Sequence, residues 1–185
     1  MRFLNAFAII AALALSACGG EPLRTGPIDL RVLRSLENAR LDPASTMTML
    51  NDYRRSHGFQ PVRRDPALMA MAQRQADAMV VANAMSHNAN GSFASRLAAA
   101  DVNASEAGEN LGGGYYSAEE AMTGWRNSPE HNANLLLPKA TRFGIAIAKD
   151  PLTSYRIYWA MEVAADPLQA ADGARMLMAP TEVRQ

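Results

Sequence analysis

The feature that most constrains the fold is a pair of strand-like segments near the end of the chain, which follow a helix-rich stretch. Residues 142–150 (RFGIAIAKD) alternate bulky and small side chains, and residues 155–165 (YRIYWAMEVAA) are rich in aromatic and β-branched residues. The loop DPLTS between them suits an antiparallel hairpin. Residues 106–116 (EAGENLGGGYY) are expected to add another strand. Helices that come first and strands that cluster late predict an α+β layered domain.

Amphipathic spacing and end signals predict helices ahead of this strand pair. Asp65 is a suitable N-cap with Pro66 at the first helical position, and Ser117 with Glu120 forms a capping box. Ser128 is also expected to cap a short helix, which would occupy its side-chain oxygen. The predicted helices cover residues 29–40, 45–58, 65–85, 92–102, 117–125 and 128–136.

The helix predicted over residues 45–58 places Met47, Leu50, Tyr53 and His57 on one face. His57 stands beside a glycine at the end of this helix, where a cation is favoured. We therefore interpret His57 as a structural residue.

The composition favours one domain and argues against a nucleic-acid partner. The chain has 185 residues, of which 49% are hydrophobic, which is enough for a packed core. Eighteen basic residues balance eighteen acidic ones, so no whole-chain field attracts nucleic acid or an acidic surface. The two tryptophans, Trp125 and Trp159, are expected in the core.

The first residues have the layout of a secretory signal. Arg2 precedes an apolar run that ends at Leu15 and is shorter than the ~20 residues needed to span a bilayer. The next residues, LSAC, resemble a bacterial lipobox, in which Cys18 is lipidated and becomes the N-terminus. Cys18 is the only cysteine, so it cannot form a disulfide within the chain. An ordinary cleaved signal with an incidental cysteine is the alternative.

These features divide the chain into four predicted parts. Acyl chains on Cys18 would hold the protein on a membrane. Gly19 follows the cysteine in place of Asp, which by analogy with Gram-negative sorting favours the outer membrane, facing the periplasm, over the inner membrane. The parts are a lipoprotein signal peptide at 1–17, a glycine- and proline-containing tether at 18–44, a folded domain at 45–165 and a C-terminal tail at 166–185.

The polar motifs of the domain resemble those of one known family. MSH ends in His87, GEN contains Glu109 and Asn110, and WRNSPEHNANLL follows them. With LNDYRRSHG ahead and the two strands behind, this order resembles the CAP superfamily, or SCP domain, which includes cysteine-rich secretory proteins, antigen 5 and plant pathogenesis-related proteins. The likeness covers about residues 46–164. It is closest to the bacterial cysteine-free branch, which reads W-x-x-S-x-x-H-x-x-N-L-L; the matching residues are Trp125, Ser128, His131, Asn134, Leu135 and Leu136.

The resemblance implies a three-layer α-β-α sandwich with helices on both faces of a small antiparallel sheet. It also implies a shallow cleft lined by histidines and acidic residues. The motifs carry His87, Glu109 and His131 over as cleft residues, with Asn110 and Ser128 beside them.

The sequence also departs from the eukaryotic members of this family. Ser128 stands where they have a second glutamate, and Tyr158 stands where a strand motif begins with a second histidine. Ala160 and Met161 replace the Thr-Gln that usually ends this motif. The four-residue site of the eukaryotic members is therefore incomplete.

Three roles are open for these residues. His87, His131 and Glu109 have the ligand types of a zinc site with an open fourth position, although no HExxH pair brings two of them together on one helix. Histidine and glutamate can also exchange protons near neutral pH without a metal. A structural role is the third reading, in which Glu109 holds a buried network and the motif asparagines, Asn110 and Asn134, satisfy backbone groups.

Covalent hydrolysis would need a nucleophile. Ser86 and Ser128 stand near histidines in the sequence, but neither lies in a G-x-S-x-G elbow. We therefore expect a membrane-anchored, exported, noncatalytic module that binds a lipid, peptide or glycan in the cell envelope. The alternative is a metal-assisted hydrolase that uses the His/Glu cleft, with zinc as the divalent metal.

Overall fold

The computed structural model describes residues 23–167, and their core is a four-stranded sheet. The strand order is β1-β3-β4-β2, so β1 and β2 form the two edges. The β3–β4 and β2–β4 pairs are antiparallel, whereas β1 pairs with β3 in parallel. The strands are β1 (Arg63–Arg64), β2 (Ala107–Gly113), β3 (Ala140–Lys149) and β4 (Ile157–Ala165).

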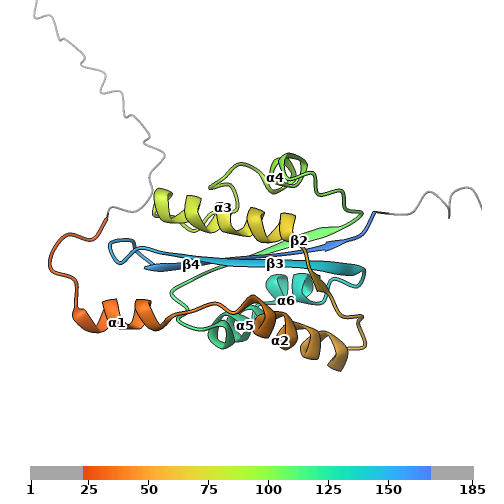
Figure 1. Ribbon diagram of the computed structural model, residues 1–185, viewed down its shortest axis with the longest axis horizontal. Coiled ribbons are helices and arrows are strands. Elements are labelled where there is room, and N and C mark those ends of the chain that lie inside the picture. Colours follow the sequence, from red (N-terminus) through yellow and green to blue (C-terminus); the bar gives the residue numbers. More distant parts are fainter. Residues whose placement is uncertain (1–22, 168–185) are drawn as a thin grey trace, which may run out of the picture.

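Helices cover both faces of this sheet (Figure 1). Helices α3 and α4 lie on one face, and the remaining four lie on the other. The predicted three-layer α+β sandwich is confirmed. The two-residue strand β1, which pairs in parallel with β3, was not predicted from the sequence. The helices are α1 (Leu30–Asn38), α2 (Pro43–Ser56), α3 (Pro66–Ala82), α4 (Phe93–Ala99), α5 (Ala118–Arg126) and α6 (Pro129–Leu135).

The alternation of large and small residues along β3 determines how closely each layer packs. Phe143 and Ile145 point into the core beneath α2 and α5, where Trp125 is also buried. Gly144 faces α3 instead, and a Cβ there would overlap the backbone of Leu68. Helix α3 can therefore lie directly against the sheet only because this position is a glycine.

Side-chain caps start most of the helices where the sequence places them. Asp65 accepts hydrogen bonds from the amides of Ala67 and Leu68 at the start of α3. Ser117 caps α5, as predicted. Ser128 occupies the predicted N-cap position of α6 with an extended backbone, but the expected capping hydrogen bond from its side chain is not formed. Its oxygen is therefore not occupied by the helix end.

The predicted apolar face of α2 is shifted. Leu50 is buried as expected, but His57 is exposed and Arg54 is fully buried in its place. The Arg54 guanidinium donates to the carbonyls of Leu135, Leu137 and Ala140, which lie between the last residue of α6 and the first residue of β3. A charged side chain occupies the core here because it satisfies loop carbonyls that would otherwise be buried without partners.

Part of the segment predicted as a tether packs against the domain. Leu36 of α1 and Ala39 are buried in the core cluster that also contains Leu50. Lys149 of β3 donates to the carbonyls of Leu36 and Ala39 and so holds the end of α1. The signal peptide, Cys18 and residues 168–185 of the tail lie outside the described residues. Between residues 23 and 167 no helix is both long and apolar enough to cross a bilayer.

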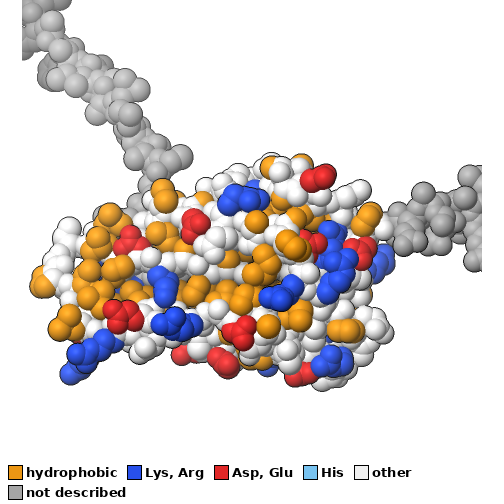
Figure 2. Space-filling model, viewed as in Figure 1, with side chains coloured by type: hydrophobic (Ala, Val, Ile, Leu, Met, Phe, Trp, Pro, Cys, Tyr) orange, Lys and Arg blue, Asp and Glu red, His pale blue; other side chains and the backbone are white. Residues whose placement is uncertain are grey.

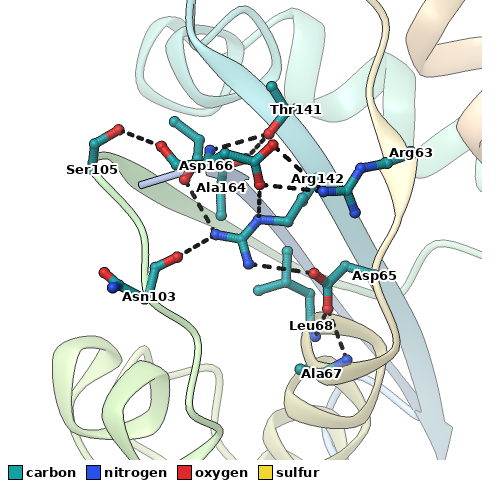
Figure 3. Close-up of polar contacts among 11 residues, drawn as sticks. Arg63, Asp65, Ala67, Leu68, Asn103, Ser105, Thr141, Arg142, Ala164 and Asp166 are labelled. Atoms are coloured by element: carbon teal, nitrogen blue, oxygen red, sulfur yellow. Dashed lines mark hydrogen bonds and ion pairs between the residues drawn. The ribbon is translucent and has the colours of Figure 1, made fainter. Parts of the chain in front are cut away.

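A buried arginine closes the end of the sheet where β4 finishes (Figure 3). Arg142 of β3 pairs with Asp65 at 3.4 Å and with Asp166 at 3.0 Å. It also donates to the backbone carbonyls of Asn103 and Ala165. Arg63 shares Asp166, so two arginines face two carboxylates. This balanced cluster, which we call the Arg142 cluster, ties β1, α3 and the end of β4 together.

Candidate functional site

The candidate site is built on the edge strand β2, which presents its residues to both helical layers. Side chains alternate along a strand, so Glu109 and Asn110 point to opposite faces of the sheet. Glu109 faces the layer of α3 and α4, and Asn110 faces α6. The GEN motif therefore connects the two layers at one edge.

Glu109 is a buried carboxylate held by a buried arginine. Its side chain is 2% exposed, and Arg96 of α4 grips both of its oxygens, at 2.7 Å and 2.9 Å. A bidentate pair of this kind fixes the position of the carboxylate. Arg96 also donates to the carbonyls of His87 and Gly91, so it fastens the loop that follows α3.

His87 extends this buried pair to the surface. Its Nδ1 lies 2.7 Å from Oε1 of Glu109, while its side chain is 58% exposed. The carboxylate fixes the orientation of the ring and leaves Nε2 outside this hydrogen bond. The result is a solvent-accessible imidazole that is rigidly supported from below.

A second carboxyl group, that of Glu162 in β4, lies directly opposite Glu109 in the sheet register. It is 0% exposed, and its nearest charged partner is Arg96, at 3.8 Å. Neither of its oxygens has a hydrogen-bond partner among the described residues. Burial, reinforced by the charge of Glu109, raises the pKa of Glu162 well above its ordinary value, although Arg96 and Arg74 oppose this shift. Its burial therefore favours the protonated, uncharged form of Glu162 more than in an exposed glutamate.

His131 reaches the site from the opposite layer. The Asn110 side chain donates to the His131 carbonyl at 2.9 Å, and Asn134 donates to Asn110 and to the Glu109 carbonyl. These bonds fasten α6 to β2. Burial lowers the pKa of His131, and the charge of His87 lowers it further while Glu130 opposes the shift. The two imidazoles are thus close enough to interact electrostatically.

The structure joins the predicted site residues in two ways. His87 and Glu109 are in direct contact, and His131 is linked to them through Asn110. Ser128 lies at the start of α6, one turn before His131. Asn110 and Asn134 satisfy backbone carbonyls, which is the structural role predicted for them.

The other residues with predicted structural roles have them. Trp125 and Trp159 are buried and donate to the Leu111 and Tyr115 carbonyls. His57 caps the end of α2 through Nδ1 and the Tyr53 carbonyl.

Two residues of the candidate site, Arg96 and Glu162, are not predicted from the sequence motifs. Each is a charged residue in an apolar setting: Arg96 in the segment SFASRLAAA, and Glu162 in the strand YWAMEVAA. A charge within an otherwise apolar strand is the available signal, because buried charges are rarely retained without a partner or a role. Neither residue belongs to the motifs that carried the family resemblance.

The arrangement does not suit Glu109 as a metal ligand. Both carboxylate oxygens are already bound, one by Arg96 alone and the other by Arg96 and His87. Over residues 23–167 no group of three or more His, Cys, Asp or Glu side chains is disposed to hold an ion. What Glu109 does here is orient His87, the supporting role that carboxylates have behind histidines.

Within residues 23–167 neither the Ser86 nor the Ser128 hydroxyl is seen to hydrogen-bond a histidine, as an activated nucleophile would. The Ser86 hydroxyl accepts a hydrogen bond from the Asn88 amide, within the loop that carries His87. Tyr158, in the place of the second family histidine, is buried and donates to Asn83 at 3.1 Å. The site therefore offers an oriented imidazole and buried acids, without an activated hydroxyl.

Comparison with known proteins identifies the family and structures with the same fold. The model of the CAP family, described as the cysteine-rich secretory protein family, matches residues 47–163. An extracellular protein containing an SCP domain from Bacillus anthracis superposes with a TM-score of 0.59 at 21% identity, over 77% of this chain and 45% of that one. A cysteine-rich secretory protein from Staphylococcus aureus gives 0.56 at 17% identity, over 72% and 39%. No curated protein matches the chain.

An outer surface protein from Borrelia burgdorferi has a TM-score of 0.58 at 18% identity, over 68% of this chain and 96% of that one. The chain thus spans less than half of the length of the first two proteins and nearly all of the third. At these identities the likeness concerns the fold.

Proposed function

The chain belongs to the cysteine-rich secretory protein family, and from this premise we propose that it is an exported, lipid-anchored binding module of the cell envelope. The exposed and oriented imidazole of His87 carries the binding role. A ring that is already held by Glu109 and Arg96 loses little conformational freedom when it contacts a ligand. Its free nitrogen suits a phosphate, carboxylate or hydroxyl group of an envelope lipid, peptide or glycan.

Binding assays with two histidine variants test this role. We would measure binding of the full-length protein to envelope phospholipids, to peptidoglycan stem peptides and to glycan strands. His87→Ala should weaken binding to one of these classes at least tenfold, equivalent to ~1.4 kcal/mol. His57→Ala, at an exposed histidine that caps α2, is the matched control and should bind like the wild type. Equal binding by all three proteins would refute the role of His87.

The alternative, a metal-assisted hydrolase, makes different demands. It needs a metal that His87 and His131 hold, with Glu109 free to act as a ligand or base. Because Arg96 occupies Glu109, we expect zinc titrations of the wild type, His87→Ala and His131→Ala to be indistinguishable. Stoichiometric zinc binding that both variants lose would favour the hydrolase instead. Hydrolysis that survives Glu109→Gln would place the activity elsewhere.

The anchoring part of the proposal rests on the signal layout of residues 1–17 and on Cys18 as the only cysteine. The names of similar structures include an extracellular and an outer surface protein, which agrees with export. Mass spectrometry should find Cys18 acylated at the N-terminus, and Cys18→Ser should release the protein from membranes. Gly19→Asp should move it from the outer to the inner membrane if the sorting analogy holds.

A further inference from the structure

One end of the domain carries an unusual set of apolar side chains. Leu23, Leu30, Val81 and Tyr155 are 54%, 66%, 87% and 41% exposed, and they are the exposed large hydrophobic residues of the described chain. Single exposed apolar residues need no explanation, but a group of them on one surface marks a contact site. We call these four residues the apolar end.

Three separate segments meet there. The Arg24 amide donates to the Leu152 carbonyl at 2.8 Å, which joins the first described residues to the β3–β4 loop. The Ser154 amide donates to Asn83 at 2.7 Å, which joins the same loop to the end of α3. In Figure 1 the start of α1, the end of α3 and the β3–β4 loop all lie at the left end of the molecule. Figure 2 shows hydrophobic side chains along that margin.

Basic residues accompany the apolar ones. Leu30, Arg31 and Arg34 are all exposed on α1, and Arg24 is exposed just before it. Across residues 23–40, arginines at 24, 31, 34 and 40 outnumber the acidic residues at 29 and 37. Apolar side chains beside arginines suit the interface of an anionic bilayer, where basic residues are attracted to the lipid headgroups.

The covalent chain places the proposed anchor near this end. Leu23 is the fifth residue after Cys18, and five extended residues span at most ~18 Å. An acylated Cys18 therefore keeps Leu23 within this distance of the lipid interface, whatever path the intervening residues take. Ser105, which donates to the Asp166 carbonyl, lies at the opposite end of the domain, beside the end of β4.

We infer that the apolar end rests on an anionic lipid surface, with Leu23, Leu30, Val81 and Tyr155 in the headgroup region. This inference depends on the lipid anchor of the proposed function and adds an orientation to it. Contact of the apolar end with the lipid would then hold the domain in one orientation on the membrane.

Accessibility of labelled cysteines tests the pose. Full-length acylated protein would be placed in vesicles of phosphatidylethanolamine and phosphatidylglycerol, with an environment-sensitive fluorophore on Val81→Cys or, as a control at the far end, on Ser105→Cys. The label at position 81 should be quenched several-fold less by aqueous iodide than the label at 105. Adding Leu23→Ser and Leu30→Ser to Val81→Cys should raise quenching toward the level at 105.

The same samples separate the two claims. Mass spectrometry reports whether Cys18 is acylated, and an unmodified Cys18 would overturn the anchor on which the inference rests. Acylated protein with equal quenching at positions 81 and 105 would overturn the pose and leave the anchor standing.

Discussion

Two buried arginines hold carboxylates in this domain, and their surroundings differ. In the Arg142 cluster two arginines face two aspartates, and Arg142 also binds the backbone carbonyls of Asn103 and Ala165. Arg96, by contrast, lies between two buried glutamates, and Glu162 receives no hydrogen bond. Only the second cluster reaches the surface through an imidazole, that of His87.

This difference separates a structural network from a candidate site. The Arg142 cluster closes the end of the sheet, and its charges balance. The second cluster, which we call the Arg96 cluster, consists of Arg96, Glu109, Glu162 and His87. Its Glu162 carboxyl group is buried without a hydrogen bond, which is costly for stability and serves no packing purpose that an apolar residue would not serve better. What it does provide is a rigid, charged support beneath an exposed ring. The proposed binding role therefore concerns the Arg96 cluster, whereas the Arg142 cluster holds the sheet and its neighbouring elements together.

The largest expected effect is on stability, when either buried arginine, Arg96 or Arg142, is replaced by alanine. Arg96→Ala leaves Glu109 buried without its charge partner and should lower the free energy of unfolding by ~3–5 kcal/mol. Arg142→Ala should cost less, because Asp166 is half exposed and Asp65 keeps its two backbone amides. Urea unfolding of both variants measures the difference. A larger loss for Arg142→Ala would reverse the comparison.

A pH-dependent effect follows from Glu162. Its folded pKa lies above the ordinary value of 4.5, so the folded state holds a proton that the unfolded state releases. This contribution to stability is complete below the unfolded pKa and is lost as the pH rises through the folded pKa. Glu162→Gln should therefore stabilise the protein at pH 8 and have little effect at pH 4. Glu119→Gln, at an exposed site, is the control; equal effects of Glu162→Gln at both pH values would contradict the raised pKa of Glu162.

Removing the exposed ring should affect binding more than folding. In His87→Ala the Glu109 carboxylate keeps both bonds from Arg96, so the stability loss should be about 1 kcal/mol. Urea unfolding and the ligand assay on one preparation separate the two quantities. A loss as large as that of Arg96→Ala would show that His87 belongs to the structural core.

The smallest expected effect concerns His131. Burial and the charge of His87 hold its pKa below the ordinary value of 6.5, so its neutral form is favoured when folded. This contribution to stability is present above pH 6.5 and is lost as the pH falls through the folded pKa. A proton NMR titration should show His131 titrating below the ordinary histidine value of 6.5, and His87→Ala should raise the His131 pKa. An unchanged value in the variant would mean that the two rings do not interact.

The sequence predicted most of the framework because local signals were strong. The Asp65–Pro66 start of α3 and the strand pair 142–150 and 155–165 all appear close to their predicted bounds. Strand β1 escaped because two residues carry no periodicity, and its pairing depends on β3, far along the chain. The burial of Arg54 was not predicted, because its partners are carbonyls that only the folded chain brings together.

Only part of the site was predicted, because local motifs identify single residues but not the distant residues that contact them. His87 and Glu109 could be named from their motifs, and their contact is confirmed. The partner that binds Glu109 lies on α4, and the acid opposite it lies on β4, so neither spacing nor composition connects them. The zinc hypothesis treated Glu109 as a free ligand, which it is not once Arg96 is in place.

The central claim is that His87, oriented by Glu109 and Arg96, contacts the ligand. The most direct test is nitrogen NMR of the full-length protein labelled at histidine, titrated separately with phospholipid, stem peptide and glycan strand. One class should shift the Nε2 signal of His87 to saturation, leave His57 unmoved, and lose this effect in Glu109→Gln. Nε2 signals of His87 that stay fixed at saturating concentrations of all three classes would contradict the account.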